Sequence, residues 1–549
     1  MNEQSTMYDL VLEAKQKNPH NGAIFYQGSR FSYIKFVKKI DRMADILTNV
    51  LDIKENDMVM VAQPNIPDTL ILIYALNKIG AIVNLVHPFT PFNRVKEIID
   101  KTNCKYAFLF EQRVAKEVDK YRDLASIIYV TRIEDYLPIF KKIFYHCFMN
   151  NKIRKKLGYY HGGFDGFKYL HSLKPTKKGS PTVRGDLKKT SVLLHSGSTT
   201  GDPKTICLSD NGFNHIASQV CDFSNSTYKQ LKGTYFITAL PSFHGFGFCM
   251  TMHTPICGRC GMYLIPKFST KEVNKALKKK KISVIVGVPT MYETLLKDPK
   301  FNNNKGLKHV RACFSGGDSM SITLEDRFND VLSKNKSIAK IYEGYGLTES
   351  IAANCCNRAS HYKKGSLGYP IKDVTFKILD EDDKEVPLGK IGEICINSPA
   401  NMLEYFKDEV STKKTLKNGY VHTGDYGYMD KDGFIFFSQR IKRVVKVSGV
   451  GVFPTEIEKL VQTIPGVEQV CAIQIPDPRL NHAIKLFVVG KYFDKEGFKE
   501  TIMDTCRKYL IRWSVPKEIE FIDELPMTLL GKVDFKKLQE MEDKKRGLL

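Results

Sequence analysis

The chain has 549 residues, of which 42% are hydrophobic and 26% charged, and its formal net charge is +23. This length predicts three or four folding units of roughly 150 residues, and the composition is ordinary for a soluble globular protein. The lysines are spread along the whole chain without zinc-finger spacing or an aromatic RNA-binding signature. This pattern disfavours nucleic acid and leaves a simple surface bias, or attraction to anionic membranes or polyphosphate ligands.

The first hundred residues alternate helical and strand-like patterns, which predicts βαβ units and a parallel sheet. The apolar stretch 70–87 is broken by Asn77, Lys78 and Asn84, so it reads as a buried helix and strand. A membrane-spanning helix would need about 20 nearly unbroken apolar residues. We expect helices at 31–50, 70–79 and 94–102 and strands at 57–63 and 81–85. The same alternation of strands and helices recurs at 233–240, 273–280, 284–287 and 321–334.

Segment 136–160 differs from the alternating pattern before it, because it is both aromatic and strongly basic. It places Phe140, Phe144 and Phe148 at i, i+4 spacing and carries six lysines and arginines with no acidic residue. A helix over 137–157 would be about 30 Å long. Such a basic amphipathic helix suits the surface of an anionic bilayer. The alternative is a helix packed on the body with a solvated basic face.

After residue 440 the pattern changes to that of a small α+β unit. A helix is expected at 454–464, beginning at a proline, followed by strands at 469–475 and 484–490 and a helix at 496–511. We therefore predict an α/β fold with a large N-terminal domain of layered subdomains (1–438), a hinge (439–442) and a small mobile C-terminal α+β domain (443–549).

Residues 1–18 lack the apolar core of a signal peptide, which favours the cytoplasm. Thirteen cysteines are present, and we expect core thiols, because an odd number without a signal does not suggest a disulfide framework. Cys257 and Cys260 form a CxxC, but no second pair follows to complete a zinc site.

The loop 196–204, with sequence Ser-Gly-Ser-Thr-Thr-Gly-Asp-Pro-Lys, follows an apolar run. Small residues allow backbone N–H groups to approach phosphate oxygens, and hydroxyls and a lysine add donors. It is not a Walker A loop, because Asp202 and Pro203 separate Gly201 from Lys204. Considered alone, such a loop is more often a simple turn.

Five segments, in order, resemble motifs of the adenylate-forming superfamily, which includes acyl-CoA synthetases, luciferases and peptide-synthetase adenylation domains. They are the loop 196–204, Tyr345-Gly-Leu-Thr-Glu349, His422-Thr-Gly-Asp425, the basic stretch from Arg440 through Pro454, and Pro526-Met-Thr-Leu-Leu-Gly-Lys532. The likeness covers essentially the whole chain.

The resemblance implies an ATP-dependent enzyme that joins a carboxylic acid to AMP and then passes the acyl group to a thiol, with ATP, Mg²⁺ and CoA as cofactors. Lys532 would bridge the carboxylate and the α-phosphate, since positive charge must offset two meeting anions. Glu349 would bind Mg²⁺ and Thr348 phosphate. The phosphate loop would contribute Ser196, Gly197, Ser198, Thr199, Thr200, Gly201 and Lys204.

The same resemblance assigns the remaining positions. Asp425 and Arg440 would bind the ribose, and Gly316, Gly317, Asp318 and Tyr345 would lie around the adenine. Lys442 falls at the hinge, and Lys446 and Gly449 would approach the pantetheine arm of CoA. Gln439 and Thr205 stand where the family commonly has glycine, which affects local backbone geometry rather than the charged groups.

Segment 241–248, Pro-Ser-Phe-His-Gly-Phe-Gly-Phe, resembles the acyl-pocket motif of fatty acyl-CoA synthetases. Amino-acid-activating relatives carry an aspartate near this point, and none lies between Leu240 and Met250. His244 could gate the pocket or could be a structural histidine. We expect a medium- or long-chain fatty acid:CoA ligase. The alternatives are an enzyme that loads an acyl or aryl acid onto a carrier protein, and a non-catalytic nucleotide- or membrane-binding protein.

Overall fold

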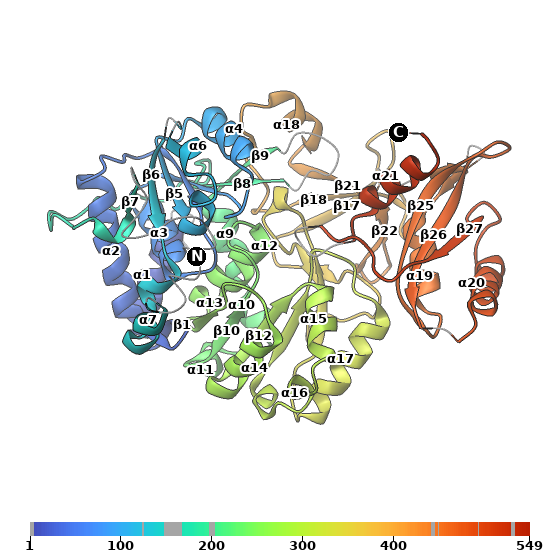
Figure 1. The fold of residues 1–549 in the computed structure, drawn as a ribbon, viewed down its shortest axis with the longest axis horizontal. Helices are drawn as coiled ribbons and strands as arrows, with labels where there is room; N and C mark the ends of the chain where they lie inside the picture. Colours follow the sequence, from blue (N-terminus) through green and yellow to red (C-terminus); the bar gives the residue numbers. More distant parts are fainter. Residues whose placement is uncertain are drawn as a thin grey trace.

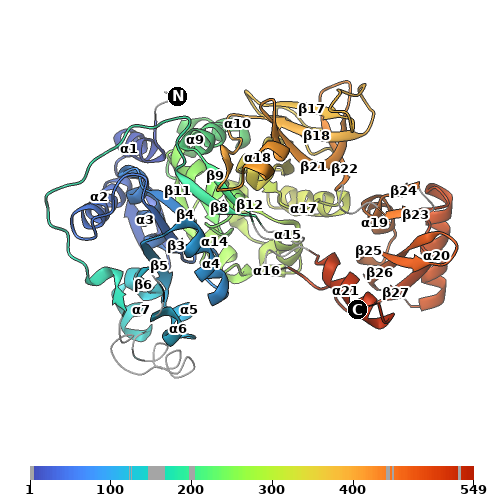
Figure 2. The ribbon, with the colours of Figure 1, turned by 90° about the horizontal axis from the view of Figure 1, so that it is seen from above.

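The computed structural model describes residues 5–122, 124, 126–145, 147, 167–196, 204–440, 445–447, 450–491, 493–528 and 533–548. The N-terminal four-fifths of the chain form a large body of three sheets and their helices, and the C-terminal part lies to one side of it (Figures 1 and 2). The hydrophobic clusters follow the same division, because two of them contain only residues after 444.

The first sheet is mostly parallel and carries the expected βαβ units. Its helix α3 (Pro67–Lys78) is buried along its whole length, and its central residues 70–76 are all apolar. In spatial order the strands are β19 (Glu404–Tyr405), β9 (Thr205–Leu208), β8 (Val192–His195), β4 (Ile82–Leu85), β3 (Met58–Ala62), β5 (Tyr106–Phe110), β6 (Ile127–Thr131) and β7 (Lys168–Tyr169).

The second sheet has nine strands and a parallel centre. Its order is β16 (Tyr369–Pro370), β15 (Cys355–Cys356), β14 (Ile341–Tyr345), β13 (Ala312–Ser315), β12 (Ile282–Gly287), β10 (Tyr235–Thr238), β11 (Gly261–Leu264), β1 (Gly22–Tyr26) and β2 (Ser29–Ser32). The third sheet is antiparallel and comprises β17 (Thr375–Leu379), β18 (Gly392–Asn397), β21 (Tyr420–Met429), β20 (Leu416–Lys417) and β22 (Ile435–Arg440).

Several helices of the body begin at residues whose side chains cap the free backbone N–H groups of the first turn. Serine side chains cap α2, α14 and α17 by accepting a backbone N–H three residues on. The helices are α1 (Met7–Lys17), α2 (Tyr33–Asn49), α4 (Phe92–Thr102), α5 (Glu111–Val114), α6 (Val118–Arg122), α7 (Ile139–Phe144), α9 (Asp210–Ser218), α10 (Val220–Phe223), α11 (Tyr228–Leu231), α12 (Gly245–Phe248), α13 (Thr254–Cys257), α14 (Thr270–Lys279), α15 (Pro289–Leu296), α16 (Pro299–Asn302), α17 (Ile322–Lys334) and α18 (Glu409–Thr415).

The C-terminal part is a small α+β unit with its own core. A three-stranded sheet of β25 (Val467–Asp477), β26 (Asn481–Gly490) and β27 (Glu518–Phe521) is accompanied by the hairpin β23 (Val445–Val447) and β24 (Val450–Val452). Its helices are α19 (Pro454–Gln462), α20 (Lys495–Tyr509) and α21 (Phe535–Lys545). The α/β fold class, with a large N-terminal and a smaller C-terminal domain, is confirmed.

A buried ion cluster holds α21 on this sheet. Lys485 of β26 lies 2.7 Å from Glu542 of α21 and 2.7 Å from Glu520 of β27, and its side chain is only 4% exposed. Just before α21 the chain closes a short loop. Met527 and Val533 form a β-bridge, and the Asp534 N–H donates to the Pro526 carbonyl at 2.7 Å.

The predicted helix over 137–157 is described only in part. Helix α7 covers Ile139–Phe144, and Phe148 and residues 149–157 lie outside the described residues. The cysteines are free and most of them are buried, Cys260 in the CxxC among them, which confirms core thiols rather than a disulfide framework. Among the described residues, no helix is both long and apolar enough to cross a membrane.

Candidate active site

The predicted phosphate loop connects two antiparallel neighbours, β8 and β9. At its stem the Ser196 N–H donates to the Lys204 carbonyl at 2.9 Å, and the Lys204 N–H donates to Ser196 Oγ at 2.9 Å. These reciprocal bonds fix the two ends of the loop against each other. The intervening predicted residues, Gly197, Ser198, Thr199, Thr200 and Gly201, lie outside the described residues.

Tyr405 joins two of the predicted catalytic residues. Its hydroxyl donates to Glu349 Oε1 at 2.8 Å, and the Lys204 ammonium lies 4.3 Å from the centre of its ring. Burial and the Glu349 carboxylate raise the pKa of Tyr405, so the phenol keeps its proton. The sheet builds this contact, because β19 pairs with β9 and sets Tyr405 opposite Ile206.

Thr348 and Glu349 occupy a one-turn 3₁₀ helix that ends in a strained turn. Ile351, a β-branched residue, has φ of 69° and ψ of −63°, and the Ala352 N–H donates to the Ser350 carbonyl at 2.8 Å. This is the rare form of a three-residue turn, and such strain concentrates at functional sites. A Cβ on Gly245 would lie 2.0 Å from the Ile351 carbonyl oxygen, so only glycine fits beneath the turn.

Asp425 and Tyr345 meet across two sheets. The Tyr345 hydroxyl donates to Asp425 Oδ2 at 2.7 Å, and Asp425 is buried. Between the pairs Cys395–His422 and Glu393–Tyr426, strand β21 has two more residues than β18. The resulting bulge, with Gly424 at φ 69°, redirects the chain immediately before Asp425. On the other side of β21, Asp425 is paired with Arg440 of β22.

The predicted adenine residues adjoin the acyl motif. Gly316 and Gly317 follow β13, and Gly317 has φ of 80°. A Cβ on Gly316 would lie 3.0 Å from the ring of Phe246 and 3.3 Å from the Gly344 carbonyl oxygen. The glycine therefore allows the aromatic ring of segment 241–248 to pack directly against the end of β13.

His244 stands at the N-terminus of α12, where its Nδ1 accepts the Phe246 N–H at 3.3 Å. The sequence left open a gate or a structural histidine, and this cap is a structural contact. Another histidine, His195, ends β8 beside the phosphate loop, with its Nε2 2.7 Å from Asn84 Oδ1. Burial lowers the pKa of His195 to about 3, so the ring is neutral at physiological pH.

Most of the remaining predicted residues belong to the C-terminal part or the segment that leads into it. Arg440 ends β22 and Lys446 lies in β23. Lys442, Gly449 and Lys532 lie outside the described residues. Asp318 follows Gly317, and its carboxylate accepts the Ser319 N–H at 2.9 Å.

Sequence reasoning missed Tyr405 because no motif marks it. In the sequence, Tyr405 is marked only by its place eight residues after the apolar run that forms β18. Its contacts depend on the pairing of β19 with β9, which lies about two hundred residues earlier in the chain. Glu343 was also missed. It lies in β14 next to the YGxTE motif and accepts the Met320 N–H at 3.1 Å, and burial raises its pKa to about 7.

Comparison with solved structures defines the class of the fold. The ATP-bound crystal structure of MatB from Rhodopseudomonas palustris superposes with a TM-score of 0.82, at 21% identity over 98% of this chain and 99% of that one. The anthranilate CoA ligase AuaEII, in complex with anthranoyl-AMP, superposes with a TM-score of 0.81 at 20% identity, over 100% and 99% of the two chains. The fold is that of adenylate-forming enzymes.

The chain belongs to the AMP-binding enzyme family, whose pattern matches residues 11–406, and the C-terminal domain of AMP-binding enzymes matches residues 456–532. It is 29% identical to a long-chain-fatty-acid–CoA ligase of Escherichia coli O6:H1 over 99% of this chain and 95% of the relative. It is 27% identical to a ligase of the same name from Bacillus subtilis, over 98% and 94%. The predicted superfamily is confirmed, and with it the class of AMP-forming acid–thiol ligases, for which ATP, Mg²⁺ and CoA are typical.

Proposed function

We propose that the protein activates a medium- or long-chain fatty acid with ATP, releases pyrophosphate, and transfers the acyl group from the adenylate to the thiol of CoA. The observation that carries this assignment is a pair of partly buried contacts, Tyr345 with Asp425 and Tyr405 with Glu349 and Lys204. Both unite family motifs that lie far apart in the sequence. The names of the full-length relatives support a fatty acid as the substrate.

The residues suit the groups that ATP would present. Asp425 is a carboxylate able to accept from ribose hydroxyls, with Arg440 on the neighbouring strand. Glu349 offers the hard oxygen that Mg²⁺ prefers, and Tyr405 fixes one of its two oxygens. We assign phosphate contacts to Thr348, Lys204 and the loop 196–201, and adenine contacts to Gly316, Gly317 and Tyr345. Bound Mg²⁺ would offset charge on the polyphosphate.

The chemistry needs a cation at the reacting atoms. A carboxylate oxygen attacks the α-phosphorus and pyrophosphate leaves, so the substrate brings two anions together. Lys532 is assigned to neutralise them. For the second step, residues 443–549 would rotate about the hinge 439–442 relative to residues 1–438, bringing Lys446 and Gly449 towards the pantetheine arm.

The acyl end of the site is apolar. Segment 241–248 has no acidic residue that could bind a substrate ammonium, and Phe246 packs against Gly316 at the nucleotide end. This arrangement favours a hydrocarbon chain whose carboxylate meets the α-phosphate. His244 is a candidate for contact with the acid only if its cap on α12 opens.

The decisive experiment measures pyrophosphate release from Mg²⁺-ATP with acids from C8 to C18, with and without CoA. The expected result is turnover with fatty acids and formation of a CoA thioester. Adenylate without thioester would point instead to a carrier protein as the acceptor. Turnover only with aryl acids would contradict the fatty-acid assignment, and no turnover with any acid would contradict the enzymatic one.

Helix α7 suggests contact with an anionic membrane. Four large apolar side chains project from it, with exposed fractions of 69% for Ile139, 84% for Phe140, 56% for Ile143 and 59% for Phe144. Lys141 and Lys142 lie between them, and Lys275, Glu272 and Lys279 of α14 are close enough to influence Lys141. Apolar side chains beside lysines fit a lipid surface with negative head groups. The expected location is the cytoplasm, with peripheral contact at the inner face of a membrane.

Replacing Phe140 and Phe144 with aspartate should weaken binding to vesicles containing phosphatidylglycerol about 10²–10⁴-fold. Each buried aromatic contributes roughly 1.5–3 kcal/mol, and the new charges face the head groups. Co-sedimentation measures the effect. Phe493→Asp, at a phenylalanine of the C-terminal part that is more exposed than either, serves as the control. Equal binding by the double variant and the control would refute membrane contact through α7.

A further inference from the structure

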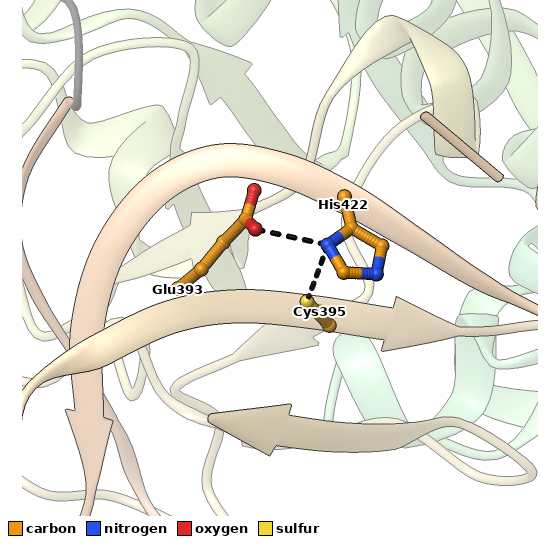
Figure 3. A group of neighbouring side chains, drawn as sticks. All are labelled: Glu393, Cys395 and His422. Carbon is orange, nitrogen blue, oxygen red and sulfur yellow. Dashed lines mark hydrogen bonds and ion pairs between the residues drawn. The ribbon is translucent and has the colours of Figure 1, made fainter. Parts of the chain in front are cut away.

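A cluster of side chains with the chemistry of metal ligands lies outside the proposed substrate contacts. Glu393 and Cys395 are two residues apart in β18, so they share one face of the strand. His422 is paired with Cys395 on β21. Figure 3 shows Glu393 and Cys395 converging on the same ring nitrogen of His422, at 2.9 Å from Glu393 Oε2 and 3.5 Å from Cys395 Sγ. The ligand atoms of all three residues lie within 4.8 Å of one another.

A second carboxylate lies near the cluster on its solvent side. Asp383 Oδ1 lies 3.8 Å from His422 Nδ1, and its side chain is half-exposed. Each carboxylate has its other oxygen held by the protein. Glu393 Oε1 accepts the Gly424 N–H at 2.8 Å, and Asp383 Oδ2 pairs with the Lys417 ammonium at 2.9 Å. Such outer partners are what orient carboxylate ligands in metal sites.

The spacing matches a tetrahedral ion. With metal–ligand bonds of about 2.0–2.3 Å, tetrahedral geometry places neighbouring ligand atoms about 3.3–3.8 Å apart. The distances from His422 Nδ1 are 2.9 Å to Glu393, 3.5 Å to Cys395 and 3.8 Å to Asp383. Small shifts of Glu393 and Cys395 would bring them into range with His422, whereas Asp383 lies outside the group of three ligand atoms within 4.8 Å of one another and would have to move further to complete the set.

We propose that Glu393, Cys395, His422 and Asp383 form a binding site for Zn²⁺. Thiolate, imidazole and carboxylate are the ligand types that this ion takes. Binding transfers the Cys395 proton to solvent, and the ion offsets the negative charge of the thiolate and one carboxylate. The site adjoins the bulge of β21, so the ion would stiffen the turn that leads into Asp425.

The same residues could instead be a metal-free hydrogen-bond network, in which Glu393 simply joins His422 to the Gly424 backbone. The two arrangements differ at Cys395. Burial and the carboxylates of Glu393 and Asp383 raise the pKa of this thiol. Without an ion it remains protonated, whereas an ion would hold it as the thiolate.

Titration of the chelator-treated, full-length protein with Co²⁺ tests the site. Co²⁺ stands in for Zn²⁺, and a bound thiolate gives a sulfur-to-metal charge-transfer absorption in the near ultraviolet. One equivalent is expected to produce this band, and Zn²⁺ should abolish it by displacement. Cys395→Ser should remove the band, and His422→Gln should weaken affinity at least 10-fold.

Two further variants keep the test decisive. Cys471→Ser, at a buried cysteine of β25 in the C-terminal part, should leave the band unchanged. Asp383→Asn, at a half-exposed position that should not disturb folding, should weaken Co²⁺ binding about 10-fold or more while the circular dichroism spectrum stays that of the parent. The absence of a charge-transfer band in the parent protein, or an unchanged band in Cys395→Ser, would overturn the assignment in favour of the metal-free network.

Discussion

Replacing Lys532 with alanine is expected to slow formation of the acyl-adenylate about 10²–10³-fold. The reaction brings a carboxylate and a triphosphate together, and loss of one positioned charge at the reacting atoms commonly has an effect of this size. The measurement is single-turnover pyrophosphate release at saturating Mg²⁺-ATP and fatty acid. Binding of ATP should change far less, because the other phosphate contacts are assigned to the loop 196–204, Thr348 and Glu349.

The matched control is Lys537→Ala, which removes an exposed lysine from α21 only five residues further on. It should retain nearly the full rate. A second measurement separates the two steps, because thioester formation from preformed acyl-adenylate and CoA should survive in Lys532→Ala. Equal loss in both half-reactions would contradict a role confined to adenylation and would indicate a general structural defect.

Lys485→Met is expected to lower the free energy of unfolding of the C-terminal part by about 1–3 kcal/mol. The substitution leaves Glu542, whose side chain is 2% exposed, without the ammonium at 2.7 Å, while the Arg546 guanidinium stays 2.6 Å from its other carboxylate oxygen. Leaving a buried charge with no partner has an effect of about 3–5 kcal/mol, and the remaining Arg546 contact makes the expected loss smaller. Thermal or urea unfolding followed by circular dichroism would show an early transition for residues 443–549.

Lys545→Met provides the comparison. Lys545 also pairs with Glu520, at 3.0 Å, but its side chain is 62% exposed. An exposed ion pair contributes about 0–1 kcal/mol, so this variant should unfold almost as the parent does. If both variants lost the same small amount, the buried cluster would not be what holds α21 on its sheet.

Much of the fold was predictable from local patterns. Helix α2 has the expected apolar spacing, and the helix expected at 454–464 begins at Pro454. Strands β3 and β12 were predictable because each is a short run of mostly apolar residues. The structure buries each of them along nearly its whole length. These features depend on a few neighbouring residues, which the sequence displays directly.

The contacts within the site were less predictable because they depend on register between distant segments. The sequence singled out Glu349 and Lys204 but not Tyr405, which joins them through the pairing of β19 with β9. Ile351 illustrates a different limit. Local preference disfavours positive φ for a β-branched residue, and only packing against Gly245 and the core selects it.

The proposed Zn²⁺ site likewise combines one feature that the sequence predicts with contacts that only the structure reveals. Spacing alone places Glu393 and Cys395 on one face of a strand. Their contact with His422 requires the two-residue bulge of β21. Gly424 is the only residue in the sequence that hints at this bulge. Asp383 enters from yet another segment, before β18, so its approach could be seen only in three dimensions.

The bridge between Met527 and Val533 limits how far Lys532 can travel by itself. Consecutive Cα atoms are 3.80 Å apart, so the Lys532 backbone stays about 4 Å from the bridged residue Val533, whatever the loop does. Val533 leads directly into α21, and α21 is held to the sheet by Lys485. The backbone of Lys532 can therefore move only a short distance relative to the C-terminal sheet. In the proposed adenylation step, the approach of Lys532 to the α-phosphate would therefore be set by the position of the whole C-terminal unit, and the rate of adenylation would report that position.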